Sequence, residues 1–146
     1  MRQNRSAVAQ PQDRAEGSFG AEEDPAASER APVDETVIEQ LASITDGQGY
    51  SVLGELLNAF LTAVPGRLEA LDRALAASDG TALGDQAHAL TGSAASFGAR
   101  GMADLCRELR TAAEGGDLER AGRLVMALHD EFLRVRTWLV TFRSRS

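Results

Sequence analysis

One histidine stands out in this sequence because of the residues around it. His88 lies in the segment DQAHALTGSAASFGA, residues 85–99, whose apolar spacing predicts an α-helix. The predicted core stripe of this helix is Leu83, Ala87, Leu90 and Ala94. The adjoining face carries His88 together with small or short residues: Gly84, Thr91, Gly92 and Ala95. An exposed face usually holds long polar side chains, and two glycines inside a helix cost about 1.5–2 kcal/mol relative to alanine. We infer that another surface approaches this histidine closely.

The chemistry open to such a histidine is nucleophilic. A neutral imidazole nitrogen can attack an electrophilic group, but alone it neither binds a nucleotide nor hydrolyses a substrate. The sequence has no Gly-rich phosphate loop followed by Lys and Ser/Thr, and no acidic triad suited to Mg²⁺. We therefore expect a second protein to complete any reaction at His88.

A metal site is not expected. Carboxylate-bridged di-metal bundles need Glu-x-x-His on two helices, whereas Met126 stands three residues before His129 and Asp85 stands three before His88. Cys106 is the only cysteine, which excludes an intrachain disulfide and a cysteine-based metal site. We interpret His129 and Cys106 as structural residues, and we predict no metal and no cofactor in this chain.

Composition narrows the class of partner. The net charge is −7 and the pI is about 4.8, which argues against a nucleic-acid partner because binding would require a basic face. The chain has no lysine, so all 15 basic residues are arginines. No apolar run approaches the roughly 18 residues of a membrane span, and no apolar segment resembles a secretory signal. We expect a cytoplasmic protein without a membrane partner.

The sequence divides into three parts. Residues 1–32 are rich in Gln, Ser, Ala, Pro, Gly and acidic residues, and their small apolar content predicts a disordered N-terminal tail. Residues 33–142 carry helical patterns and are assigned to one helical bundle. Residues 143–146 are predicted to form a polar C-terminal tail.

Five helices are expected in the bundle region. The second, from about residue 50 to 77, contains Pro65-Gly66, where we expect a kink rather than a break because the apolar seam keeps its phase. Gly98 is placed to end the helix of His88 in the left-handed conformation. Three aspartates are predicted N-caps: Asp34, Asp79 and Asp117.

Short loops between these helices favour antiparallel neighbours. The predicted fold class is therefore all-α, an antiparallel up-down-up-down four-helix bundle with an additional N-terminal helix. Such a bundle buries its own apolar seam, so a monomer is the simplest expectation.

The segment around His88 resembles the histidine-containing phosphotransfer (HPt) domain family. That family has histidine, then an apolar residue at +2, lysine at +3, glycine at +4, serine at +5 and glycine at +10. The corresponding residues here are His88, Leu90, Thr91, Gly92, Ser93 and Gly98. FLTAVPGRLEALDRALAASD resembles the family's second helix, and MADLCRELRTAAEGGD resembles the helix after the phosphohistidine helix. The resemblance covers about residues 34–140.

The resemblance implies a phosphoryl carrier rather than an enzyme. Nε2 of His88 would accept a phosphoryl group from the aspartyl phosphate of a response-regulator receiver domain and pass it to another receiver. The partners implied are receiver domains and/or a hybrid histidine kinase. The receiver would supply the aspartate, a lysine and Mg²⁺. Gly84, Gly92 and Ala95 would leave room for the receiver's loops.

Thr91 departs from the family pattern because it stands where the family has a cationic lysine. Any replacement cation must be an arginine, and the candidates are Arg67, Arg107 and Arg110. We expect one of them within about 10 Å of His88, inside a Debye length at moderate salt. The alternative function is a non-phosphorylated HPt-like adaptor that binds and regulates a receiver or a histidine kinase.

Overall fold

The computed structural model describes residues 31–145. The prediction of a disordered tail concerns residues 1–32, of which all but the last two lie outside the described range. Five helices occur within that range: α2 (Glu35–Ala42), α3 (Leu53–Ala76), α4 (Gly80–Ser96), α5 (Arg100–Glu114) and α6 (Leu118–Arg145). Among these helices, none combines the length and apolarity that a membrane crossing requires.

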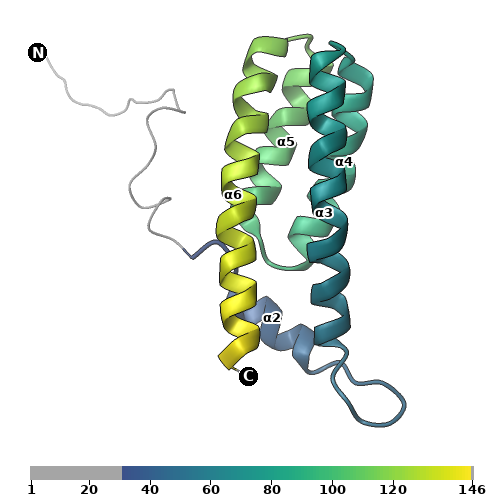
Figure 1. Cartoon of the computed structure of the whole chain (residues 1–146), viewed down its shortest axis with the longest axis vertical. Helices are drawn as coiled ribbons and strands as arrows, with labels where there is room; N and C mark the ends of the chain where they lie inside the picture. Colours follow the sequence, from purple (N-terminus) through teal and green to yellow (C-terminus); the bar gives the residue numbers. More distant parts are fainter. Residues whose placement is uncertain (1–30, 146) are drawn as a thin grey trace, which may run out of the picture. The chain divides into compact units, whose positions relative to one another are not determined.

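Helices α3 to α6 form a four-helix bundle (Figure 1). Helix α3 packs against α4 and α6, and α5 packs against the same two helices, so the four helices close into a ring. The loops 77–79, 97–99 and 115–117 are short and reverse the chain each time. Helix α2 packs against α3. The predicted all-α up-down-up-down bundle with an additional helix before it is confirmed.

The apolar residues of each helix meet in one core. In α4 the four residues of the predicted core stripe, Leu83, Ala87, Leu90 and Ala94, are fully buried. Burying one leucine side chain stabilises the fold by about 1.5–3 kcal/mol, so such seams set the rotation of each helix. The predicted apolar seam of α3 runs from Leu53 to Leu75. Its two end residues are partly buried, and the five between them are buried: Leu57, Phe60, Val64, Leu68 and Leu71.

The predicted helix ends are present. The three predicted capping aspartates, Asp34, Asp79 and Asp117, accept hydrogen bonds from the backbone N–H groups of Thr36, Ala82 and Arg120 at 3.0, 3.0 and 3.1 Å. Gly98 has φ +73°, which is the predicted left-handed conformation. Its carbonyl accepts from the backbone N–H of Asp34 at 2.9 Å. The start of α2 is therefore attached to the turn between α4 and α5.

Helix α3 differs from the prediction at its start. It begins at Leu53 rather than near Tyr50, because Asp46 organises a turn before it. The Asp46 carboxylate accepts from the backbone N–H groups of Gln48 at 2.8 Å and of Tyr50 at 3.0 Å. These bonds, with that of Tyr50 the largest cause, lower the pKa of Asp46. Helix α3 then continues through Pro65 as one helix, as expected.

The end of the chain also differs from the prediction. Residues 143–145 were expected in a polar tail, but α6 extends to Arg145. One contact holds this last turn, since Nη1 of Arg143 donates to Oδ1 of Asn58 on α3 at 2.7 Å. The polar composition of the segment therefore reflects an exposed helix end rather than an end of helical structure.

Candidate functional site

His88 lies on the exposed side of α4, near the middle of the helix. Its neighbours Ala87 and Leu90 are fully buried. Because successive helical side chains are about 100° apart, burial of these two residues turns His88 away from the core. The imidazole thus stands on a rigid element and faces outward.

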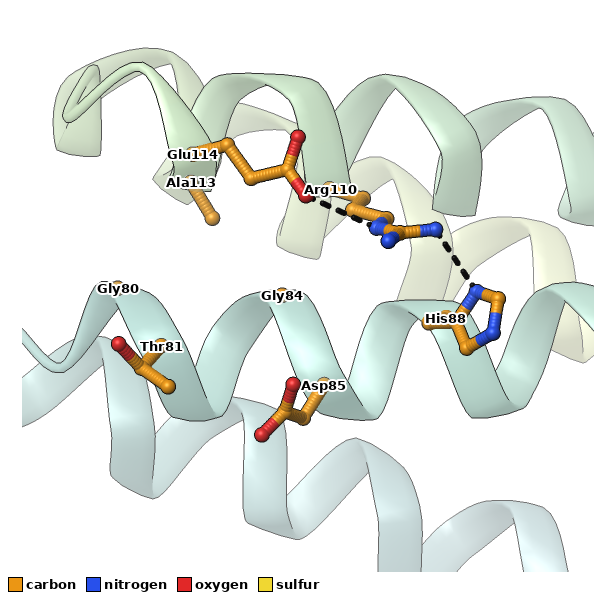
Figure 2. A pocket seen from close by; sticks show the side chains of 8 residues that line it. All are labelled: Gly80, Thr81, Gly84, Asp85, His88, Arg110, Ala113 and Glu114. Atoms are coloured by element: carbon orange, nitrogen blue, oxygen red, sulfur yellow. Dashed lines mark hydrogen bonds and ion pairs between the residues drawn. The ribbon is translucent and has the colours of Figure 1, made fainter.

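The imidazole contacts an arginine of the neighbouring helix. Nη1 of Arg110, on α5, lies 2.9 Å from Nδ1 of His88. Nε of the same guanidinium donates to Oε2 of Glu114 at 3.0 Å. Figure 2 shows the three side chains linked across the space between α4 and α5, with Nε2 on the side of the ring away from Arg110. No residue in the range 31–145 forms a hydrogen bond with Nε2.

Arg110 reaches His88 because α4 and α5 pack closely. A Cβ atom on Gly80 would lie 3.1 Å from the Ala113 carbonyl oxygen, and one on Gly84 would lie 4.0 Å from the Ala113 Cβ. The expectation that Gly84 is exposed is wrong, because it is buried against α5. Its small size serves the helix contact first, and its contact with a partner stays a prediction.

The remaining predicted partner-binding residues lie toward the C-terminal end of α4. Gly92 and Ala95 are exposed, and a Cβ atom added to Gly92 would meet nothing within 4 Å. Thr91 is half-buried, and its hydroxyl donates to the Ala87 carbonyl at 2.9 Å. The surface of this part of α4 therefore carries only short side chains, and the Thr91 hydroxyl already bonds within the helix.

The three candidate arginines occupy different places. Arg110 contacts the imidazole, which confirms the expectation of a cation within about 10 Å. Arg107 lies one turn earlier on α5 and pairs with Asp104 at 2.8 Å. Arg67 extends from α3 and donates to Oε1 of Gln86 at 3.1 Å. Of the three, Arg110 is the one that bonds to the ring.

Two hollows adjoin the imidazole. The larger is a groove of about 650 Å³ between α4 and α5, shown in Figure 2 and lined by Gly80, Thr81, Gly84, Asp85, His88, Arg110, Ala113 and Glu114. The smaller measures about 380 Å³ and is lined by His88, Thr91, Arg107, Arg110, Thr111 and Glu114. Both are open, so a docked protein loop can reach the ring from outside.

His129 and Cys106, which we interpreted as structural residues, line neither hollow beside the His88 ring. Nε2 of His129 is 3.0 Å from Oδ1 of Asp72, which links α6 to α3 at the surface. Cys106 is fully buried, and this burial raises the pKa of its thiol to about 12. Within residues 31–145, no group of three or more His, Cys, Asp or Glu side chains could hold a metal ion.

Sequence reasoning missed Glu114, which orients the guanidinium of Arg110. The spacing of four residues between Arg110 and Glu114 on one helix was a usable signal, since such pairs are neighbours on a helix surface. What the spacing does not give is that this pair faces His88, because that depends on how α5 packs against α4.

Comparison with known proteins agrees with this geometry. Residues 55–138 match the model of the Hpt domain. The structure is similar to the crystal structure of histidine-containing phosphotransfer protein B (HptB) from Pseudomonas aeruginosa PAO1, with a TM-score of 0.73 and 31% sequence identity. That match covers 79% of this chain and 96% of HptB. A comparison with curated proteins gave no significant match. The chain belongs to the Hpt domain family, which supports a histidine phosphotransfer role in a phosphorelay.

Proposed function

We propose that this chain is a phosphoryl carrier whose acceptor is Nε2 of His88. The phosphoryl group comes from the aspartyl phosphate of a receiver domain and passes to the aspartate of a second receiver. The partners are response-regulator receiver domains and/or a hybrid histidine kinase. The receiver contributes the aspartate, a lysine and Mg²⁺, and Mg²⁺ neutralises charge on the group in transfer.

The observation that carries this proposal is the arrangement of the His88 ring. Its Nδ1 is occupied by Arg110, whereas Nε2 faces away from that contact and bonds to no described residue. Transfer through a loose transition state depends mainly on positioning and on charge neutralisation. A helix with a buried seam provides the positioning, and the open surface at Gly92 and Ala95 admits the partner.

Arg110 provides the positive charge that Thr91 lacks. Its guanidinium contacts the ring that would carry the phosphoryl group, and a guanidinium remains charged at any physiological pH. Glu114 offsets part of this charge, but its carboxylate bonds to Nε and leaves the Nη1 and Nη2 groups for other acceptors. The cation therefore comes from the neighbouring helix rather than from one turn along α4.

The second candidate function is a non-phosphorylated adaptor that binds a receiver or kinase through the same face. The observation that favours it is Thr91, whose hydroxyl bonds to its own helix and offers the phosphoryl group no charge. In this case the docking face would be used, but His88 would accept nothing.

Phosphorylation of the chain separates the two functions. The chain is incubated with a labelled, phosphorylated receiver, and the stability of any transferred label is measured in acid and in alkali. A phosphoryl carrier acquires acid-labile, alkali-stable label, whereas an adaptor binds the receiver without acquiring label. His88→Gln should lose the label, and His129→Gln, which changes the second of the two histidines, should retain it. Label that survives in His88→Gln would contradict the assignment of the acceptor.

A further inference from the structure

The contact between Arg110 and His88 fixes the position of the proton on the imidazole. A guanidinium carries five N–H donors and no acceptor, so Nη1 of Arg110 can only donate. Nδ1 of His88, at 2.9 Å, must therefore accept with its lone pair. The neutral ring then has its proton on Nε2. The structure thus holds the imidazole in its Nε2–H tautomer.

This tautomer is the wrong one for attack through Nε2. The nitrogen that attacks phosphorus needs its in-plane lone pair, and in the Nε2–H tautomer that electron pair forms the N–H bond. Nδ1 has a lone pair, but Arg110 occupies it. In the resting arrangement, neither ring nitrogen presents a free lone pair to a receiver.

We propose that Arg110 is a gate on His88, which keeps the ring unreactive until a docked receiver draws the guanidinium away from Nδ1. The inference rests on the proposed function, because it concerns how Nε2 becomes a nucleophile. Once Arg110 leaves, the proton moves through water from Nε2 to Nδ1. The phosphoryl oxygens on the receiver's aspartate are the acceptors that attract the guanidinium.

The surroundings of Arg110 allow this movement. Its side chain is 46% exposed, so no tight packing confines it. The groove of about 650 Å³ beside it is lined partly by Gly80, Gly84 and Ala113, which contribute no long side chains to it. Nε remains bonded to Glu114, so the guanidinium can turn about this attachment while its Nη1 group changes acceptor.

Phosphoryl transfer can then take place at Nε2. The lone pair of Nε2 forms an N–P bond as the P–O bond of the aspartyl phosphate breaks, and the electron pair of that bond goes to the receiver's carboxylate. The ring, with its proton on Nδ1, becomes cationic and releases this proton to water. The neutral phosphorylated ring again has a lone pair on Nδ1, and Arg110 can return to it. In the reverse direction, Nδ1 must be reprotonated before phosphoryl transfer, so Arg110 gates both directions.

The test measures the tautomer in the unphosphorylated chain at a pH where the ring is neutral. Nitrogen-15 shifts and two-bond couplings of the labelled ring report which nitrogen carries the proton. The variants are Arg110→Ala and Arg107→Ala, which removes a guanidinium one turn away that pairs with Asp104. We expect the ratio of Nδ1–H to Nε2–H to rise about three- to tenfold in Arg110→Ala, as for loss of one exposed hydrogen bond of ordinary net strength. Arg107→Ala should resemble the wild type.

Two results would overturn the gate. One is a wild-type ring with Nδ1–H as its main tautomer, and the other is a tautomer ratio that Arg110→Ala leaves unchanged. Neither result depends on phosphorylation, so the proposed function is judged separately by the acid-labile label on the wild type. If the chain accepts phosphate but its tautomer ratio does not depend on Arg110, the carrier function stands and the proposed role of Arg110 as a gate is wrong.

Discussion

The hydroxyl of Thr91 donates to the carbonyl of Ala87 at 2.9 Å, within the helix that carries His88. The residue that replaces the family's lysine therefore gives its hydrogen to its own backbone. Thr91 thus supplies neither a positive charge nor a free hydroxyl hydrogen, and the guanidinium that contacts the ring comes from another helix. Position 91 is also a place where the charge can be restored by mutation.

Arg110→Ala should shorten the lifetime of the phosphorylated chain, and Thr91→Lys should restore it in the same background. An exposed ion pair is worth about 0.5–1 kcal/mol, which corresponds to a lifetime about two- to fivefold shorter without Arg110. Loss of acid-labile label with time, after removal of the receiver, measures the lifetime. Arg67→Ala is the control, because Arg67 donates to Gln86 rather than to the ring. An equal loss in Arg67→Ala would contradict a specific role for Arg110.

Gly92→Glu should block phosphoryl transfer while the bundle stays folded. Gly92 is exposed and has open space around it, so the new side chain extends into the surface that we propose for receiver docking. Its negative charge also opposes the phosphoryl group, and such like-charge contacts reduce association by more than about tenfold. Thermal unfolding checks the fold. The free energy of unfolding should rise by about 0.5 kcal/mol in Gly92→Glu, because glycine is a poor helix former. Gly92→Ala is the matched control and should transfer nearly as the wild type does.

Gly98→Ala should destabilise the bundle. At φ +73° a side chain is strained, and the new Cβ would lie 3.0 Å from the Val37 Cβ and 3.1 Å from the Asp34 Cβ. Strain in the left-handed region costs about 1–2 kcal/mol, and the crowding adds to it. Urea unfolding measures the change in the free energy of unfolding. Gly66→Ala should instead stabilise the bundle by about 0.5–1 kcal/mol, because that position is helical and open. A Gly98→Ala variant with an unchanged free energy of unfolding would show that α2 does not depend on this turn.

The buried face of α4 was predictable because the helical spacing of apolar residues marks the face that packs against the core. Leu83 and Leu90 are fully buried where the spacing placed them. Gly84 was not predictable in the same way, since it lies at the border of the stripe. Whether a border residue is covered depends on how closely the next helix approaches, and α5 approaches within contact distance of it.

The sequence predicted which type of residue would lie near His88, but not which residue would contact the ring. The absence of lysine and the position of Thr91 led us to expect an arginine near His88, and the sequence offered three candidates. The selection of Arg110 depends on side-chain direction across the gap between α4 and α5, and on Glu114, which orients the guanidinium. Neither is encoded in local spacing, so both appear only once the helices are packed.

Cys106 should remain unreactive toward thiol reagents at pH 8 in the folded chain and react rapidly once the chain is unfolded. It is fully buried, and burial raises its pKa from 9.0 to about 12, with the Arg107 charge opposing this shift. A thiol whose pKa is raised by folding stabilises the folded state below its unfolded pKa. That contribution is lost as the pH rises from about 9 toward 12, because the unfolded chain ionises first. Urea unfolding from pH 8 to pH 11 should therefore show falling stability, and Cys106→Ala should show a smaller fall. Rapid modification of the folded chain at pH 8 would contradict the buried position of this thiol.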